Sequence, residues 1–394
     1  MPDRPTIAHV LHRLYLAGAE VLAAALARRL RERFNFIFLC LDEIGPLGHQ
    51  LASEGFTVID LKRRPGVDLA VSRRIGEVVK AQRVRLLHAH QYTPFFYASI
   101  SRGLLGLLRA KPPVLFTEHG RHYPDIRKTK RVLANRILLR RADRATAVGR
   151  FVKQALVEKE GLRESRIEVV YNGIDPAQFA GDLPGQADAS TLRASVRQEL
   201  GLSEKQVAIF QVARFHPVKD HETAIRGFAA ALSAGNARQV DASALPVLVL
   251  VGDGEGRGKC EALVRELNLT PHVKFLGVRS DVARLIQAAD IFMLSSLSEG
   301  VSVTLLEAMG ASLPIVATDV GGNGEVVAHD VSGLLSPRSD AEALGRNIAT
   351  LVADAPLRQR MGRAGHERLL TTFTQQQMHD RYAAIYEEMV SGRP

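Results

Sequence analysis

Glu299 and Glu307 stand out because seven mostly apolar or small residues separate them, with no basic residue between them. In one continuous helix their carboxylates would lie roughly 12 Å apart. That is too far for two acids sharing one metal ion, and it exceeds the roughly 5–9.5 Å of a glycosidase acid pair. The pattern favours a strand at 289–296 and a helix at 303–312, with Glu299 in the loop. Acids placed in this way can hold the two ends of an extended ligand, one binding sugar hydroxyls and the other ribose hydroxyls, while the helix N-terminus faces the phosphates between them.

A structural alternative exists for Glu307. Thr304 and Glu307 have the T-x-x-E spacing of a capping box, in which Glu307 would only satisfy a backbone N–H. This alternative leaves Glu299 unexplained, because Glu299 stands beside Gly300 at the carboxyl end of a predicted strand. We therefore favour the ligand-binding interpretation for both acids.

Arg214 and Lys219 supply positive charge in the same half of the chain. Arg214 ends a predicted strand, and Lys219 follows five residues later, before an amphipathic helix. Such a pair suits a diphosphate, because Arg offers planar bidentate donors and Lys a mobile point charge. Two solvated loop cations are the alternative, which the two acids nearby make less attractive.

Two glycine-containing segments could approach phosphates. Gly18 lies in the turn between the first predicted strand and the first predicted helix, where a phosphate could contact the backbone, although a plain turn glycine would look the same. The string VGDGEGRGK at 251–259 resembles a dinucleotide-binding fingerprint, but Arg257 occupies the place of the third glycine. We interpret this segment as a tight turn.

Alternating strands and helices must position these residues. Apolar, β-rich runs occur at 6–12, 34–41, 85–90, 113–119 and 144–149, and again at 207–214, 246–253, 273–277, 291–296 and 314–318. Strands that are apolar throughout indicate parallel sheets covered on both faces. We expect two doubly wound α/β domains, with ligands in the crevice between them, at the carboxyl ends of the strands. The expected bounds are 1–173 and 191–373, with a linker at 174–190 and a C-terminal helix at about 374–394 that packs back on the first domain.

Composition bounds the function. Among 394 residues, the two cysteines, Cys40 and Cys260, are far apart, so neither a disulfide framework nor a clustered zinc site is expected, and a reducing compartment is favoured. The N-terminus lacks the pattern of a signal peptide, and no apolar run is long enough to span a membrane.

Residues 1–180 hold 31 Lys+Arg against 17 Asp+Glu, whereas the rest holds 21 against 25. The two halves therefore face different partners.

The ordered set of motifs resembles the family 4 glycosyltransferases over nearly the whole chain. The set comprises the two acids, AMGASLPIVATDVGGNGEVV after them, VARFHPVKD, VYNGID and the GAE turn. The resemblance implies a GT-B architecture, with two Rossmann-like domains facing across a cleft. It implies that the C-terminal domain holds a nucleotide sugar such as a UDP- or GDP-sugar, and that the N-terminal domain holds the acceptor. It also implies transfer with retention of anomeric configuration and no metal ion or other cofactor.

The resemblance also implies residue roles. Arg214 and Lys219 match the diphosphate-binding pair, Glu299 the acid near the donor sugar, and Glu307 the acid that binds the ribose. The segment between the acids contributes further donor-binding positions, namely Gly300, Val301, Ser302, Val303 and Thr304.

The first domain supplies the remaining positions. Gly18 matches the loop facing the diphosphate, and His119 matches the histidine beside the reacting sugar, although alone it would be interpreted as structural. The catalytic set is thus His119, Glu299, Arg214 and Lys219. His88 and His90 are expected to be wall or acceptor residues.

Two positions depart from the family pattern. Ala17 stands where the family usually has a first glycine, which could alter the fit of the diphosphate loop. Gly149 stands where serine is common, which affects a secondary contact.

We therefore expect a hexosyltransferase that moves a sugar from a nucleoside diphosphate to a glycan or lipid-linked acceptor, in cell-surface polysaccharide or glycolipid synthesis. Acceptor attack from the face that the nucleotide leaves is preferred to a covalent route, because no carboxylate is clearly placed as a nucleophile. The alternatives are a GT-B epimerase or hydrolase, and a non-catalytic nucleotide-sugar-binding protein. Nucleic acid is not an expected partner, because the basic half lacks interleaved aromatic residues.

The basic half also suggests a membrane surface. Residues 127–144 hold eight Lys+Arg and one acid, with apolar residues at helical spacings. A basic amphipathic helix is typical of membrane-surface binding, and a helix whose apolar side faces the core is the alternative. We expect a cytoplasmic protein, peripheral at the inner face of the membrane, which it binds through Lys128, Lys130, Arg131 and Arg140.

Overall fold

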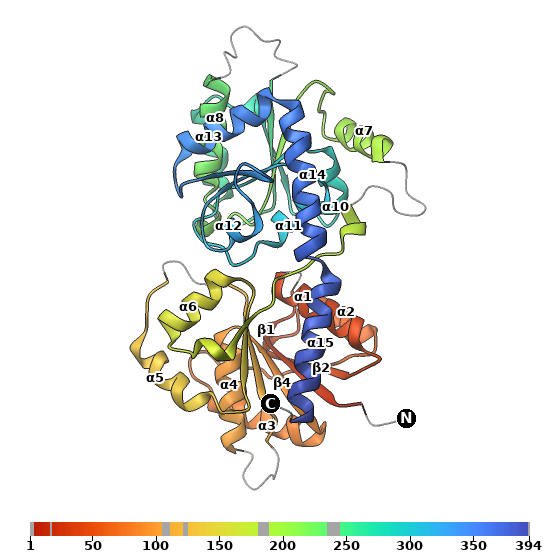
Figure 1. Cartoon of the computed structure of the whole chain (residues 1–394), viewed down its shortest axis with the longest axis vertical. Coiled ribbons are helices and arrows are strands. Elements are labelled where there is room, and N and C mark those ends of the chain that lie inside the picture. Colours follow the sequence, from red (N-terminus) through yellow and green to blue (C-terminus); the bar gives the residue numbers. More distant parts are fainter. Residues whose placement is uncertain are drawn as a thin grey trace. The chain divides into compact units, whose positions relative to one another are not determined.

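The computed structural model describes residues 4–15, 18–104, 111–120, 125–179, 189–234 and 245–392, and it divides into two units (Figure 1). Unit 1 comprises Met1–Asn172 and Gln376–Pro394, and unit 2 comprises Gly173–Gln375. Of the predicted linker, residues 180–188 lie outside the described residues. Its described part includes the short 3-10 helix η2 (Pro176–Phe179), whose Phe179 is buried.

Unit 1 is built on a seven-stranded sheet in the order β3-β2-β1-β4-β5-β6-β7, in which all neighbouring strands are parallel. The strands are β1 (Thr6–Arg13), β2 (Asn35–Glu43), β3 (Thr57–Asp60), β4 (Val84–His90), β5 (Val114–Glu118), β6 (Arg144–Ala147) and β7 (Ile167–Val169). The helices are α1 (Gly18–Leu30), α2 (Pro46–Ser53), α3 (Leu69–Ala81), α4 (Tyr92–Leu104), α5 (Thr129–Leu138), α6 (Arg150–Glu160), η1 (Glu164–Arg166) and α15 (Gln375–Ser391). The edge strands β3 and β7 were not predicted, because both are short and only partly buried.

The C-terminal helix α15 packs into the core of unit 1. Met378, Tyr382, Ile385 and Met389 are buried along one side of it, as their spacing predicted. The hydroxyl of Tyr386 lies 2.6 Å from Nδ1 of His88 on β4, so the helix also contributes polar contacts to the sheet. Its burial ties the chain's last helix to its first domain.

Unit 2 is built on a six-stranded parallel sheet in the order β10-β9-β8-β11-β12-β13. The strands are β8 (Ala208–Val212), β9 (Val247–Val251), β10 (Val273–Gly277), β11 (Ile291–Leu294), β12 (Ile315–Thr318) and β13 (Gly333–Ser336). The helices are α7 (Ala189–Glu199), α8 (His221–Ala234), α9 (Arg257–Glu266), α10 (Val282–Leu285), α11 (Val303–Gly310), α12 (Asn323–Val326), α13 (Ala341–Ala353) and α14 (Ala355–Thr372), with the 3-10 turns η3 (Pro217–Lys219), η5 (Thr270–His272) and η6 (Ile286–Ala288).

Both units therefore confirm the prediction of doubly wound, Rossmann-like domains. Their central strands are almost wholly apolar and buried, because helices cover both faces of each sheet (Figure 1). In a parallel sheet all the carboxyl ends lie at one edge, where ligands bind. The loops after β1, β2, β3 and β5 share that edge in unit 1, and those after β8, β11 and β12 share it in unit 2. Within the described ranges, no helix is both long and apolar enough to cross a bilayer.

Candidate functional site

The structure brings Lys219 and Glu299 together at the carboxyl edge of unit 2. Lys219, in η3 after β8, donates through Nζ to a carboxylate oxygen of Glu299, in the loop after β11. The hydroxyl of Ser296 donates to the same oxygen at 2.6 Å. The two charged side chains retain 23% and 11% of their exposure. Two residues predicted separately, 80 positions apart, thus form one half-buried charge pair.

The buried hydroxyl of Ser295 and a backbone hydrogen bond fix the two segments that carry Lys219 and Glu299. Ser295 donates to the carbonyl oxygens of Lys219 and Asp220, at 3.0 and 2.9 Å. The backbone N–H of Leu297 donates to the carbonyl of Val218 at 2.8 Å. The turn that carries Lys219 is therefore fixed against the loop that carries Glu299.

Two glycines after β12 complete this support. A Cβ on Gly321 would lie 2.0 Å from the carbonyl oxygen of Glu299, and one on Gly322 would lie 1.9 Å from that of Gly300. Gly321 also has a φ of +56°, a conformation that favours glycine. Sequence reasoning quoted these glycines without giving them a role. Two consecutive glycines in the loop that follows a predicted strand were the signal that could have found it.

Arg214 is held in the neighbouring turn with its side chain exposed. A Cβ on Gly252, which has a φ of +137°, would lie 2.1 Å from the carbonyl oxygen of Ala213. The N–H of Phe215 donates to the carbonyl of Asp253 at 3.0 Å. The glycine-rich string at 251–259 is thus a tight turn that packs against the Arg214 segment. Among the described residues, no acid pairs with the Arg214 side chain.

Helix α11 begins at Val303, with Ser302 as its N-cap residue. The Ser302 hydroxyl contacts the Thr304 hydroxyl at 3.1 Å and makes no capping bond to the backbone. Thr304 is the second helical residue and Glu307 the fifth, so the capping-box alternative is wrong: neither residue occupies a capping-box position. The first N–H groups of α11 have no side-chain cap.

Glu307 is a half-buried acid on this helix. It makes no hydrogen bond or ion pair with another described side chain, and burial alone raises its pKa to about 7. Strongly perturbed pKa values often mark functional sites.

In unit 1, His119 follows β5 and ends a row of three histidine rings. Its Nε2 lies 2.9 Å from Nδ1 of His90, whose Nε2 lies 2.8 Å from Nδ1 of His9. Burial lowers the pKa of His119 to about 4 and that of His9 to about 3, so the row is neutral at pH 7. His88, His90 and His119 line a cavity of about 10 Å³, and Nδ1 of His119 is buried without a partner among the described residues.

His88 and His90 themselves lie inside the unit rather than on a ligand-facing wall. Nitrogens of His9, His88 and His90 come within 4.8 Å of one another, a spacing that could hold a metal ion. However, His88 contacts the hydroxyls of Tyr386 and Thr117 at 2.6 and 2.7 Å. Hydrogen bonds therefore account for most of these nitrogens, and His90 supports His119.

Gly18 is the first residue of α1 and is exposed. It lies at the same sheet edge as His119, after β1. Ala17, one of the two departures from the family pattern, lies outside the described residues. Gly149 is the N-cap residue of α6, where a serine would offer a capping hydroxyl that glycine lacks.

Comparison with known proteins places these features in a family. Residues 193–368 match the model described as "Glycosyl transferases group 1", and residues 16–178 match "Glycosyltransferase Family 4". The chain is 26% identical to the N-acetyl-α-D-glucosaminyl L-malate synthase of Bacillus anthracis, with 95% of each chain covered. It is 25% identical to the UDP-Gal:α-D-GlcNAc-diphosphoundecaprenol α-1,3-galactosyltransferase of Escherichia coli, with 98% of each covered.

Solved structures agree in fold. A glycosyltransferase from Rickettsia africae superposes with a TM-score of 0.83 at 21% identity, covering 98% of this chain and 99% of that one. HepE of Anabaena, crystallised with UDP and glucose, gives a TM-score of 0.81 at 20% identity, covering 97% and 99%. With its two Rossmann-like units and the two family matches, the chain belongs to the family 4 type of glycosyltransferases, enzymes of the GT-B fold.

Proposed function

We propose that this enzyme transfers a sugar, with retention of configuration, from a nucleoside diphosphate sugar to a glycan or lipid-linked acceptor. The observation that carries the proposal is the arrangement at the unit 2 edge. The Lys219–Glu299 pair lies in the loops that follow β8 and β11, and Arg214 and Glu307 lie in the turn and the helix beside it. Neither Arg214 nor Glu307 forms an ion pair with any residue that the structure describes. One sheet edge thus carries two cations that can bind a diphosphate and two acids that can bind the hydroxyls of a sugar and of a ribose.

In the proposed complex, the diphosphate binds Arg214 and Lys219 and faces the uncapped N–H groups of α11. Glu307 accepts hydrogen bonds from ribose hydroxyls, and Glu299 from hydroxyls of the donor sugar. The positive charges meet the diphosphate without a metal ion.

In the proposed reaction, the bond between the anomeric carbon and the phosphate oxygen breaks, and the electron pair leaves with the nucleoside diphosphate. Arg214, Lys219 and the α11 N-terminus stabilise that charge. The acceptor oxygen forms the new bond on the same face, and its proton passes to the departing phosphate. His119 of unit 1 holds a hydroxyl of the reacting sugar.

The relatives support the substrate classes. The name of the E. coli relative specifies a UDP-linked sugar as donor and a diphosphoundecaprenol-linked sugar as acceptor. The Anabaena neighbour was crystallised with UDP and glucose. We therefore extend to this chain a nucleotide sugar donor and a lipid-linked sugar acceptor.

A panel of UDP-, GDP- and ADP-sugars tested by thermal shift identifies the donor. We expect the nucleotide sugars of one base to raise the melting temperature of the protein even in the presence of EDTA. The reason is that Arg214 and Lys219 neutralise the diphosphate without a metal ion. Rapid release of the nucleotide without any acceptor would instead favour a hydrolase, and conversion of the donor into an epimeric sugar would favour an epimerase.

Glu307 is expected to make UDP binding depend on pH. Its carboxylate form accepts ribose hydrogen bonds, so UDP should bind more tightly as pH rises from 6 to 8, through the pKa of about 7. Glu307→Gln should weaken UDP binding about tenfold at pH 8, since hydrogen bonds to charged groups are the stronger ones. Isothermal titration at several pH values measures both effects.

The raised pKa of Glu307 should make the stability of the ligand-free protein fall as pH rises, whereas UDP binding should strengthen. The pKa of Glu307 in the folded chain exceeds the ordinary 4.5, so the ligand-free protein should lose stability as pH rises from about 4.5 to about 7. Glu307→Gln should remove that loss, and the exposed Glu266→Gln should not. Unchanged UDP affinity in Glu307→Gln with a lower melting temperature would assign Glu307 a purely structural role.

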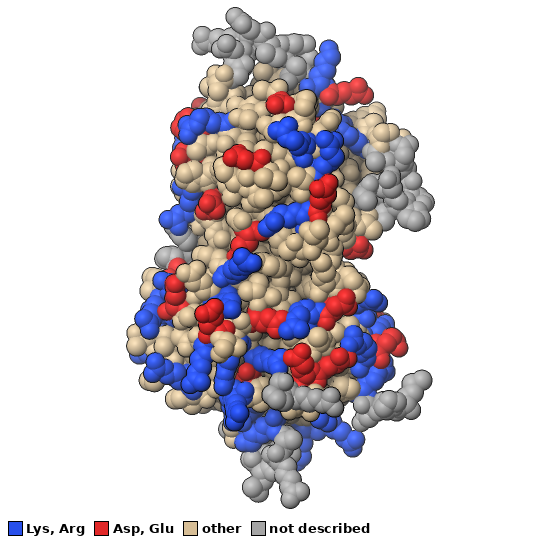
Figure 2. Space-filling model, in the orientation of Figure 1, with Lys and Arg blue, Asp and Glu red and all other residues tan. Residues whose placement is uncertain are grey.

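We also propose that unit 1 binds an anionic membrane surface through α5. Leu133 and Ile137, one turn apart on this helix, are 61% and 77% exposed, while Val132 faces the core. Exposed cations flank them at Lys128, Lys130, Arg136 and Arg140. Figure 2 shows Lys and Arg side chains around the position that α5 and α6 occupy in Figure 1. An exposed apolar strip among cations is typical of interfacial helices.

Arg131 is a correction to the predicted set of membrane-binding cations. Its guanidinium pairs with Glu160 at 3.0 Å and lies 3.5 Å from the centre of the Tyr92 ring. The side chain is therefore committed to the unit's own packing, and Arg136 takes its place in the proposed surface.

Vesicle sedimentation tests this surface. Binding should require anionic lipid and fall with salt. It should drop about 10³-fold when the four flanking cations are changed to glutamine, since each contributes about 1 kcal/mol and about 1.4 kcal/mol is a factor of ten in affinity. Leu133→Ser with Ile137→Ser should also weaken it. Neutralising four exposed cations of unit 2, Lys259, Arg265, Arg346 and Arg360, is the matched control. Equal binding to neutral vesicles would contradict the proposal.

A further inference from the structure

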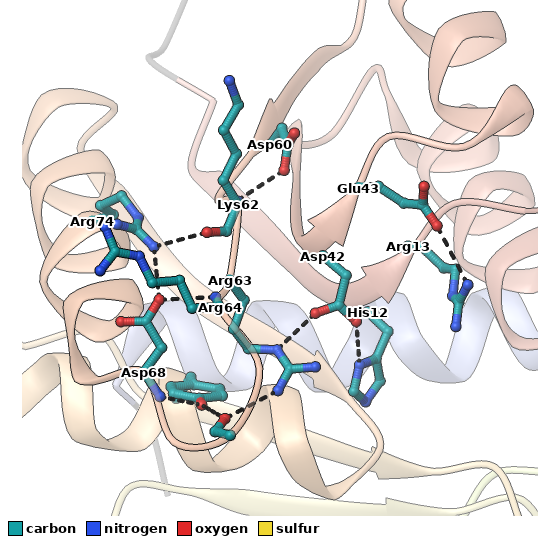
Figure 3. Close-up of polar contacts among 12 residues, drawn as sticks. His12, Arg13, Asp42, Glu43, Asp60, Lys62, Arg63, Arg64, Asp68 and Arg74 are labelled. Atoms are coloured by element: carbon teal, nitrogen blue, oxygen red, sulfur yellow. Dashed lines mark hydrogen bonds and ion pairs between the residues drawn. The ribbon is translucent and has the colours of Figure 1, made fainter.

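His12, Asp42 and Arg63 form a polar cluster at the carboxyl edge of the unit 1 sheet (Figure 3). His12 lies on β1, Asp42 on β2, and Arg63 in the loop after β3. Nδ1 of His12 is 3.0 Å from one carboxylate oxygen of Asp42, and Nε of Arg63 is 2.7 Å from the other. The three side chains are 29%, 26% and 20% exposed, so the cluster is anchored but accessible to solvent.

The pairing with Arg63 determines how His12 presents its ring. Burial opposes ionisation of Asp42, but hydrogen bonds from Arg63 and His12 outweigh it and lower the pKa of Asp42. An ionised carboxylate only accepts hydrogen bonds, so neutral His12 must carry its proton on Nδ1. Nε2 is then a hydrogen-bond acceptor, and no described residue occupies it.

The cluster lies beside the turn that begins α1. Glu20, in the first turn of α1, has a pKa raised by burial; a backbone hydrogen bond opposes that rise, and His12 and Arg13 are near enough to Glu20 to act on its pKa as well. His12 is therefore close to the Gly18 turn, which by the family resemblance faces the donor's diphosphate. His119 follows β5 on the same edge.

Structural support alone does not account for His12. Arg63 already ties the loop after β3 to Asp42 on β2. The Tyr97 hydroxyl donates to the carbonyl of Gly66 at 3.3 Å and accepts from the N–H of Asp68 at 3.0 Å. The loop is thus fixed without His12, whose ring adds one outward acceptor atom.

We propose that His12 is an acceptor-binding residue, whose Nε2 accepts a hydrogen bond from a hydroxyl of the acceptor's sugar. Asp42 is its positioning residue, because it sets the tautomer and the ring orientation, and Arg63 keeps Asp42 ionised. The ligand class is a polyhydroxylated sugar, free or lipid-linked. This inference rests on the proposed function and identifies part of its acceptor site.

Two substitutions separate an acceptor contact from a structural tie. The amide nitrogen of His12→Asn replaces Nδ1 and keeps the bond to Asp42, whereas the amide oxygen of His12→Gln replaces Nε2 and keeps the outward acceptor. The donor is the nucleotide sugar selected by thermal shift. The acceptor probes are octyl glycosides and N-acetylglucosamine diphosphate carried on a short alkyl chain. The exposed His49→Asn, on α2, is the matched control.

We expect His12→Asn to lower kcat/KM for the acceptor about tenfold, as for one lost hydrogen bond, with a higher acceptor KM. Donor hydrolysis without acceptor, UDP affinity and melting temperature should stay at wild-type values. His12→Gln should recover most of the acceptor KM. Wild-type acceptor kinetics in His12→Asn would overturn the proposal, since the tie to Asp42 would then suffice. Absence of transfer by the wild-type enzyme to any probe would refute the proposed function instead.

Discussion

Lys219→Ala is expected to lower kcat about 10²–10³-fold, as removal of one preorganised charge-stabilising group does in other enzymes. Two effects combine in this variant. The cation that meets the departing diphosphate is lost, and Glu299 is left as a half-buried carboxylate without its ion-pair partner. That carboxylate would repel the diphosphate, so UDP affinity should fall as well. Steady-state kinetics with saturating donor measures the first effect, and titration with UDP measures the second.

Matched variants show whether charge or shape matters. Lys219→Arg should retain more activity than Lys219→Ala, because it keeps the positive charge. Arg214→Lys should still be harmful, because a bidentate contact is lost. The exposed Lys205→Ala, elsewhere in unit 2, should leave turnover unchanged. Wild-type turnover in Lys219→Ala would exclude Lys219 from the diphosphate site.

Glu299→Gln is expected to lower kcat about 10²-fold while UDP affinity changes less than about threefold. The amide keeps the size of the side chain and still accepts a hydrogen bond from Ser296. The negative charge, which in the proposed reaction stabilises the positive charge developing on the donor sugar, is lost. Because UDP lacks the sugar, its affinity should report only the indirect effect on Lys219.

The exposed Glu255→Gln is the control for this substitution. A double-mutant cycle with Lys219→Ala tests the pair itself, since contacting residues show non-additive effects. If UDP affinity fell further than kcat in Glu299→Gln, Glu299 would serve only to hold Lys219.

The sequence predicted the central strands and most helices because their apolar runs are long and distinct. It missed β3, β7 and β13, which have only three or four residues each. It also predicted Arg214, Lys219, Glu299 and Glu307 as site residues, but it did not predict the Lys219–Glu299 contact. That contact depends on two turns brought together by Ser295 and by glycines after β12, which local spacing does not reveal.

Local patterns left one alternative open at Glu307 and led to one error, at Arg131. The T-x-x-E spacing could be interpreted as a capping box, but backbone geometry makes Ser302, not Thr304, the N-cap residue of the helix. Arg131 looked like any other cation of its helix, yet it faces Glu160 and Tyr92. Helical spacing shows which residues share a face, but not which face packs against the core. The His12–Asp42–Arg63 cluster, drawn from three strand ends, likewise has no signature in the sequence.

The anomeric configuration of the product tests the central claim most directly. Wild-type enzyme is incubated with the identified nucleotide sugar and an acceptor in EDTA, and the new glycosidic linkage is assigned by ¹H NMR before it can equilibrate. We predict acceptor-dependent release of the nucleoside diphosphate and a linkage of the same configuration as the donor. A product of inverted configuration, or turnover that requires added Mg²⁺ or Mn²⁺, would contradict the account.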